Sequence, residues 1–162
     1  VAYVGDGANN MAQSYLLAGA TAGMHVRIAA PAGYRPSAAV VADARAIADR
    51  TGGSVQVGGE PAEAAAGADV IVTDTWVSMG QEAEKEKRQK EFRGYCVDDA
   101  LIGRAAPDVI FLHCLPAYRG YEVAASVIDG PHSVVWDEAE NRLHAQKALL
   151  AWLLTRQAPA LH

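Results

Sequence analysis

The 162-residue sequence has little of several features that mark particular protein classes. Its two cysteines, Cys96 and Cys114, form neither a CxxC pair nor a Cys/His spacing of metal ligands, which excludes a secreted disulfide scaffold. There are 14 basic against 19 acidic residues, so the formal charge of −5 leaves no basic excess for nucleic acid. The longest apolar run, residues 148–154, is far shorter than the roughly 20 residues of a membrane span. We expect a cytoplasmic protein with no nucleic-acid and no membrane partner.

The N-terminus lacks the basic stretch and the long apolar segment of a signal peptide. Instead, an apolar run at residues 1–4 leads directly into Gly5-Asp6-Gly7, as if a core strand began at the first residue. The length matches one ordinary domain of roughly 100–200 residues. We therefore expect one domain with its own core, taken from a longer protein.

Short apolar runs rich in β-branched residues alternate with longer segments of helical character. Continuous apolar runs such as residues 70–72 and 109–112 are typical of parallel strands buried on both faces. The pattern predicts an α/β fold, a Rossmann-like three-layer sandwich with a mostly parallel open sheet flanked by helices. The expected strands are residues 1–4, 25–30, 54–57, 69–73, 108–112 and 133–136, and the expected helices are residues 10–22, 37–51, 61–67, 81–92, 97–105, 121–128 and 138–155.

Ligands of such sheets bind where the strands end, so the segments after the strands are the candidate sites. The first, Gly5-Asp6-Gly7-Ala8-Asn9-Asn10, begins like a dinucleotide fingerprint, but Asn10 stands in place of the third glycine. The second strand also ends without the acidic residue that would hold a ribose. A nicotinamide cofactor is therefore disfavoured, and either Asn9 or Asn10 is suited to cap the following helix.

The segment 74–80 after the fourth strand offers a carboxylate, hydroxyl groups and a glycine. Asp74 could bind an ammonium group, and Ser78 could donate to a carboxylate, which are the two needs of an amino-acid ligand. The alternative is an Asx or ST turn that leads into the next helix. From residue 81 to residue 91 the charges alternate in sign, and Glu84 and Arg88 have the spacing of a helical ion pair. This run indicates a solvated helix face with no chemistry.

The segment His113-Cys114-Leu115-Pro116 ends the most apolar strand. A cysteine at a strand end is more often a small buried hydrophobe than a nucleophile. Adjacent strand residues point to opposite faces, so His113 is poorly placed to activate Cys114, and a papain-like pair is disfavoured. The Leu115-Pro116 bond could be cis, which the sequence leaves open.

The last expected helix has two notable features. Asp137 and Glu140 have capping-box spacing at its start. Near its end, the leucines and tryptophan of residues 149–154 make it apolar around most of its circumference, more than one core-facing stripe requires. We expect another surface to cover this helix.

In this order, GDGANN, DTWVSMGQE, HCLPAYRGYEV and DEAENRLHAQKALL resemble the carboxyl-terminal half of the ornithine carbamoyltransferases. The resemblance implies an ornithine-binding domain over residues 1–155 and a tail over residues 156–162. That family's carbamoyl-phosphate motifs, Ser-Thr-Arg-Thr and His-Pro-x-Gln, are absent from this sequence. The resemblance therefore also implies that the chain alone is inactive.

The resemblance implies a binding site for the amino-acid end of L-ornithine. Four residues would hold it, namely Asn10, Asp74, Ser78 and Met79. Asp74 would meet the α-ammonium, while Asn10 and the Met79 backbone would bind the carboxylate.

The resemblance also implies catalytic roles for Asp74, Cys114 and Arg142. Cys114 and Leu115 would border the reacting centre, and Arg142 would bind and polarise carbamoyl phosphate. Cys114 beside Asp74 would help to orient and deprotonate the attacking amine. The implied reaction needs no cofactor and no metal.

The implied partners are L-ornithine, carbamoyl phosphate and the amino-terminal domain of the same enzyme, assembled as a homotrimer or higher oligomer. The implied pathway is arginine biosynthesis or degradation, which use the same residues. Two alternatives stay open. The acceptor could be putrescine or aspartate, although an aspartate enzyme should carry basic residues near Asp74. The chain could also be a non-catalytic Rossmann-type binding module.

Overall fold

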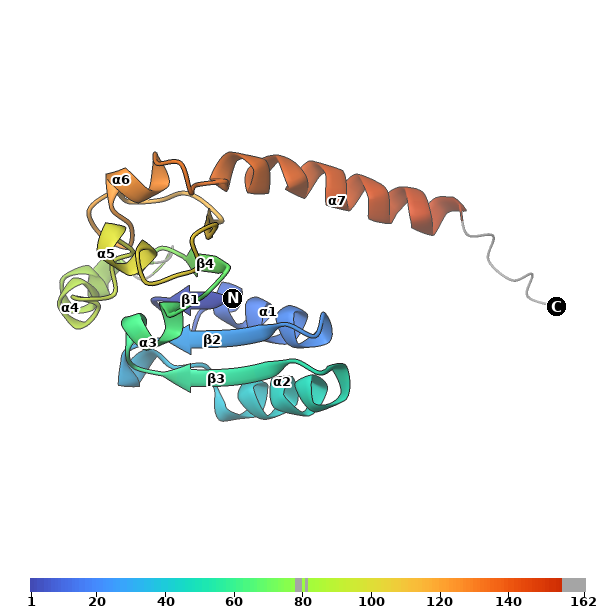
Figure 1. The fold of residues 1–162 in the computed structure, drawn as a ribbon, viewed down its shortest axis with the longest axis horizontal. Coiled ribbons are helices and arrows are strands. Elements are labelled where there is room, and N and C mark those ends of the chain that lie inside the picture. The colour runs from blue at the N-terminus through green and yellow to red at the C-terminus, as the bar shows by residue number, and fades with distance from the viewer. Residues whose placement is uncertain (78–79, 81, 156–162) are drawn as a thin grey trace.

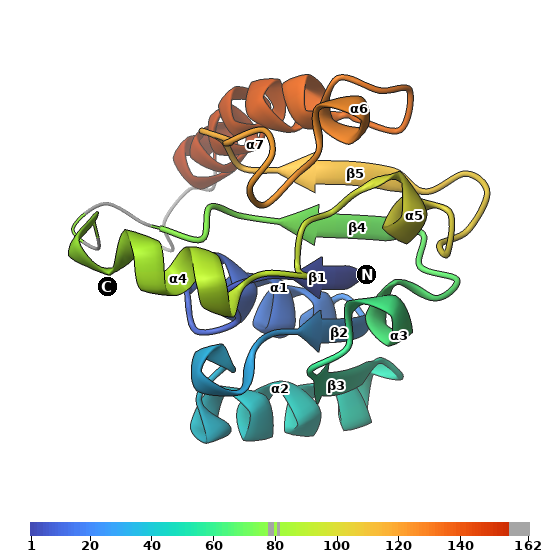
Figure 2. The same cartoon turned by 90° about the vertical axis from the view of Figure 1, so that its left-hand side faces the viewer.

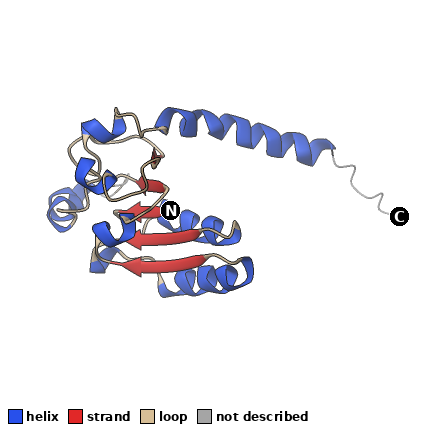
Figure 3. Cartoon of the chain, viewed as in Figure 1, coloured by secondary structure: helices blue, strands red, loops and turns tan. Residues whose placement is uncertain are grey.

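The computed structural model describes residues 1–77, 80 and 82–155, and its centre is a five-stranded parallel sheet (Figure 1 and Figure 3). The strand order is β3-β2-β1-β4-β5, with all four neighbouring pairs parallel. The predicted α/β fold with a parallel open sheet is confirmed. The strands are β1 (Ala2–Val4), β2 (His25–Ala29), β3 (Ser54–Gly58), β4 (Val70–Thr73) and β5 (Ile110–His113).

Helices cover both faces of the sheet. Two long helices pack on one face, and three short helices contribute to the core on the other face. The helices are α1 (Asn10–Thr21), α2 (Ala38–Thr51), α3 (Pro61–Ala65), α4 (Lys85–Glu91), α5 (Asp99–Ile102), α6 (Ala125–Ile128) and α7 (Val135–Thr155), with two 3-10 turns at Ala32–Tyr34 and Glu82–Glu84. In Figure 2 the strand arrowheads all point toward the side where α4 lies.

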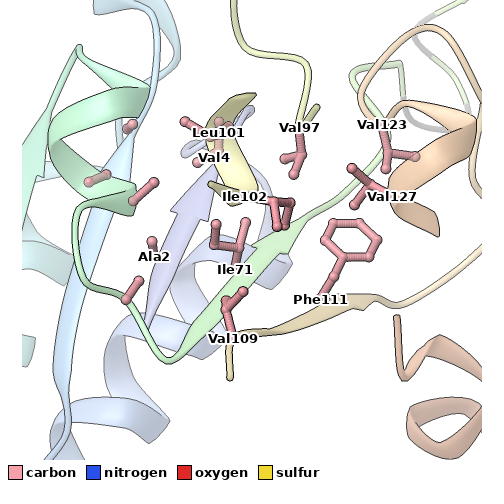
Figure 4. Close-up of a cluster of buried hydrophobic side chains, with 14 of the residues drawn as sticks. Ala2, Val4, Ile71, Val97, Leu101, Ile102, Val109, Phe111, Val123 and Val127 are labelled. Atoms are coloured by element: carbon pink, nitrogen blue, oxygen red, sulfur yellow. The ribbon is translucent and has the colours of Figure 1, made fainter. Parts of the chain in front are cut away.

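The two cores follow from the alternation of side chains along the strands. Ala2 and Val4 of β1 face the core that contains Phe111, while Tyr3 between them faces the core beneath α1 and α2. Figure 4 shows the first of these cores, with Phe111 packed among side chains of neighbouring strands and helices. The central strand β1 is buried on both faces and is wholly apolar, whereas β3 at the edge of the sheet carries the exposed Gln56.

The expected strand at residues 133–136 is wrong. Only Ser133 bridges to Phe111 of β5, and α7 already begins at Val135. Val135 is fully buried as the first residue of that helix, so the apolar run anchors a helix start instead of extending the sheet. Asp137 consequently lies in the first turn of α7 and not before it, where a capping box would need it.

Helix α7 extends away from the sheet (Figure 1). Its large apolar side chains lie exposed from Trp136 onward, and Val135 is its one buried residue among those described. The expected uncovered apolar helix is therefore present. None of the helices in the described part of the chain is long and apolar enough to cross a membrane. The exposed large apolar residues of α7 are Trp136, Leu143, Leu149, Leu150, Trp152, Leu153 and Leu154.

Candidate functional site

The segments after β1, β4 and β5 meet at one edge of the sheet. These strands are neighbours and parallel, so their carboxyl ends lie side by side, at the point where the strand order reverses. Asp74 stands at the centre of this junction. Asn9 donates from Nδ2 to Asp74 Oδ2 at 3.1 Å, and the Cys114 thiol donates to Asp74 Oδ1 at 3.2 Å. Residues distant in sequence thus converge on one carboxylate.

Asp74 is 7% exposed and well supplied with donors. In addition to Asn9 and Cys114, the Thr75 backbone N–H donates to Asp74 Oδ1 at 2.7 Å. A carboxylate can accept about four hydrogen bonds, and the described part of the chain supplies three, so one position is left for a further donor. Within the described residues, no lysine or arginine forms an ion pair with Asp74. The arrangement therefore suits an incoming ammonium group.

The Cys114 thiol is a hydrogen-bond donor in this site and not a nucleophile. Burial raises the pKa of Cys114 to about 12, and the neighbouring Asp74 charge and hydrogen bond act in the same direction. The thiol therefore keeps its proton at neutral pH, whereas nucleophilic attack needs a thiolate. Both nitrogens of His113 are engaged elsewhere, with the Leu115 N–H and with Glu122. A catalytic Cys/His pair is therefore not formed.

Asn9 is a site residue that the sequence indicated only as a helix cap. Its Oδ1 accepts from the Ala12 N–H at 2.8 Å, which caps α1, while its Nδ2 reaches Asp74. The Tyr3 hydroxyl lies 2.9 Å from the same Nδ2. Asn10, by contrast, is the exposed first residue of α1. One indication of this arrangement in the sequence is the pair of adjacent asparagines at positions 9 and 10. Only one of the two can cap the helix.

The charged helix α4 is not a purely solvated face, which corrects the prediction for residues 81–91. Arg88 is 6% exposed and pairs with the buried Asp6 at 2.7 Å and with Glu84 at 3.0 Å. Its Nη1 also donates to the backbone oxygen of Trp76 at 3.0 Å, and its guanidinium lies over the Tyr34 ring. Arg88 thereby connects the loop after β1 with the loop after β4.

Comparison with known proteins shows the family to which the chain belongs. The sequence profile of the family described as aspartate/ornithine carbamoyltransferase, Asp/Orn binding domain, matches residues 1–153. The chain belongs to this family. It is 70% identical over 154 residues to an ornithine carbamoyltransferase of Renibacterium salmoninarum, covering 95% of this chain and 50% of that protein. It is 72% identical over 152 residues to that of Clavibacter michiganensis subsp. michiganensis, with 94% and 50% covered.

A solved structure of the ornithine carbamoyltransferase from Pyrococcus furiosus superposes with a TM-score of 0.87 at 53% identity. The match covers 93% of this chain and 48% of that one. The Asp/Orn binding domain described here therefore spans about half the length of the relatives it matches.

The remaining predicted site residues of this binding domain are less connected. Leu115 follows Cys114 with a positive φ of 56° and precedes a cis bond to Pro116. Arg142 is exposed on α7, and no hydrogen bond or ion pair joins its side chain to another described residue. It stands four residues after Glu138, and so on the same side of the helix. Ser78, Met79 and the expected tail lie outside the described residues.

One group in the binding domain has the composition of a metal site. One possible ligand atom each from Asp74, His113 and Cys114 lies within 4.8 Å of the others. Each of these three side chains already has a hydrogen-bond partner within the protein. A metal ion here would have to replace those bonds and take the proton from the Cys114 thiol.

Proposed function

We propose that this chain is the ornithine-binding half of an ornithine carbamoyltransferase. The reaction joins the δ-amine of L-ornithine to the carbamoyl group of carbamoyl phosphate, giving L-citrulline and phosphate in arginine biosynthesis or degradation. The observation that carries the proposal is the convergence of Asn9 and Cys114 on Asp74 at the switch point of the sheet. The names of the two curated relatives described above support the same reaction.

In this proposal the amino-acid end of ornithine lies at the edge of β1 and β4. The α-ammonium binds at the free acceptor position of Asp74. Without it, the buried carboxylate would have no countercharge. Asn10 and the backbone of Met79 bind the carboxylate, and Ser78 contributes to the same end. The burial of Asp74 strengthens this pairing because water screens it little.

The chemistry requires a neutral amine, because only that form is a nucleophile and an alkylamine has a pKa near 10.4. The amine nitrogen attacks the carbamoyl carbon, and the bond from that carbon to the phosphate oxygen breaks. Phosphate leaves with the electron pair of that bond and with the proton that the attacking nitrogen releases. Cys114 and Asp74 orient the amine and help it to lose its proton. Arg142, together with arginines of the amino-terminal half, offsets the negative charge that develops on the carbonyl oxygen.

The acceptor distinguishes this proposal from its alternatives. A full-length enzyme containing this domain is expected to carbamoylate ornithine much faster than putrescine or aspartate, as measured by product formation at equal acceptor concentration. The 162-residue chain by itself is expected to make no citrulline. Faster turnover of putrescine would contradict the role of Asn10 and Met79, and nucleotide binding without ornithine binding would favour a non-catalytic module.

Replacing the thiol tests the role of Cys114. In a full-length enzyme, Cys114→Ala is expected to raise the KM for ornithine about tenfold and to lower kcat, because the thiol no longer helps to orient the amine. A tenfold change corresponds to about 1.4 kcal/mol of binding free energy. Binding of carbamoyl phosphate should persist. Since the pKa of Cys114 is raised to about 12, no titration of this thiol should appear in the ornithine KM between about pH 6 and pH 9.

Cys96 provides the matched control for that experiment. It is also half-buried, with a pKa raised by burial to about 11, but its thiol lies 3.9 Å from the backbone oxygen of Val97 and takes no part in the proposed site. Cys96→Ala should leave the steady-state kinetics unchanged. Unchanged kinetics in Cys114→Ala as well would remove Cys114 from the site.

We further propose that the amino-terminal half of the enzyme covers the apolar surface of α7. Leu143, Leu150 and Leu154 are each more than half exposed on this helix. Several large apolar side chains exposed together on one helix are typical of an interface. The homotrimeric assembly and the cytoplasmic location stay predictions.

A further inference from the structure

A buried pair of polar residues, His113 and Glu122, has no role in the reaction proposed above. His113 is completely buried at the end of β5, and Glu122 is 1% exposed. His113 Nδ1 accepts a hydrogen bond from the Leu115 N–H at 2.9 Å, so this nitrogen carries no hydrogen. The hydrogen is therefore assigned to Nε2, which lies 3.3 Å from Glu122 Oε1 and donates to it.

Glu122 connects this imidazole to the chain beyond the turn. Its Oε1 also accepts from the Tyr118 N–H at 2.6 Å. The segment from residue 113 to residue 118 thus folds around the imidazole, with one backbone N–H bound by the ring and another by the carboxylate. On the opposite side, the His113 N–H donates to Glu138 Oε2 at 2.9 Å.

The backbone between these anchors has an unfavourable conformation. Leu115 has a φ of 56°, in the left-handed region that residues with a side chain seldom adopt. Such conformations persist where the surroundings over-determine them, and they cluster at functional sites. The hydrogen bond from the Leu115 N–H to His113 Nδ1 holds Leu115 in this conformation. The preceding residue, Cys114, donates its thiol hydrogen bond to Asp74 in the proposed site.

We propose that His113 and Glu122 are positioning residues that hold the Cys114–Leu115 turn in the geometry needed to present the thiol to Asp74. They act through the backbone, since both imidazole nitrogens are occupied by partners within the protein. The consequence for ornithine rests on the proposed function, whereas the effect on the turn does not.

Two amide substitutions at position 113 separate this role from general stability. His113→Asn can place its amide oxygen where Nδ1 now accepts from Leu115, while His113→Gln places its amide NH2 near the position of Nε2, where it can donate to Glu122 but cannot accept from Leu115. In a full-length enzyme we expect His113→Gln to raise the ornithine KM about tenfold or more and His113→Asn to retain a value within about threefold of the parent. The KM for carbamoyl phosphate should change little in either variant.

His132→Gln is the control, because His132 also bonds the backbone beside β5, through Nδ1 and the Val109 oxygen at 2.9 Å. It should leave the ornithine KM unchanged even if the enzyme melts at a lower temperature. Equal ornithine KM values for His113→Asn and His113→Gln, or a folded His113→Gln enzyme with a parental KM, would overturn the proposal.

The turn can also be followed without any substrate. In His113→Gln we expect faster amide hydrogen exchange at Leu115 and faster alkylation of Cys114 by iodoacetamide, located by mass spectrometry, and in His113→Asn we expect neither. If the parent enzyme carbamoylates no ornithine while these differences appear, the proposed function fails and the positioning role stands. If the differences are absent, the positioning role fails whatever the enzyme's acceptor.

Discussion

Asp74→Asn is expected to weaken ornithine binding by about 2–4 kcal/mol, or roughly 30- to 1000-fold in the dissociation constant. The carboxylate is 7% exposed and its free acceptor position is the proposed seat of the α-ammonium. An amide keeps the size of the side chain and can still accept from Asn9, but it supplies no countercharge. Calorimetry with ornithine and a full-length enzyme saturated with an unreactive phosphonate analogue of carbamoyl phosphate measures this change, because no turnover then occurs.

The control for Asp74→Asn is Asp129→Asn. Asp129 is a surface aspartate at the carboxyl end of α6, where it pairs with Arg119 at 2.6 Å. Its substitution should leave ornithine binding unchanged, and carbamoyl-phosphate binding should survive both substitutions. A normal ornithine dissociation constant in Asp74→Asn would show that the assignment of Asp74 is wrong.

Arg88→Leu is expected to lower the free energy of unfolding by about 3–5 kcal/mol, because it leaves the Asp6 carboxylate buried without its countercharge. Among the described residues, Asp6 would keep only the Ala8 N–H as a donor, at 3.0 Å. The backbone oxygen of Trp76 would also lose its donor. A loss of this size is a large part of the stability of an ordinary domain. Denaturant unfolding followed by circular dichroism measures it.

Two further variants give this experiment its controls. Arg119→Leu removes an arginine from the surface pair with Asp129, where water screens both charges, and it should leave the unfolding midpoint unchanged. The double variant Asp6→Asn with Arg88→Leu should be more stable than Arg88→Leu, because no uncompensated charge stays buried. A fully stable Arg88→Leu protein would mean that the pair contributes no stability.

Local pattern was sufficient for the sheet and most of its helices. The five strands lie where apolar β-branched runs predicted them, because strands buried on both faces must be apolar along their length. The same signal failed at residues 133–136, where Val135 is buried as the start of α7. An apolar run records burial, and a buried helix start and a buried strand look alike at this length.

The sequence predicted those parts of the candidate site that lie directly at the ends of strands. Asp74 and Cys114 were singled out on that basis, and the structure brings their side chains together. The helix in which Arg88 lies has the alternating charge of a solvated surface, and nothing within it indicates a partner 82 residues away in Asp6. Asn9 likewise looked like a cap, and its bond to Asp74 spans 65 residues.

By itself, the sequence determined the fold class, the edge of the sheet that carries the site, and the residue types available there. These depend on hydrophobic periodicity and on strand ends, which are local properties of the chain. Only the tertiary structure decided that one carboxylate, Asp74, accepts from both Asn9 and Cys114, and that the partner of the buried His113 imidazole is Glu122. Those pairings depend on how distant segments pack and on which buried polar groups must find partners, and no local pattern encodes either.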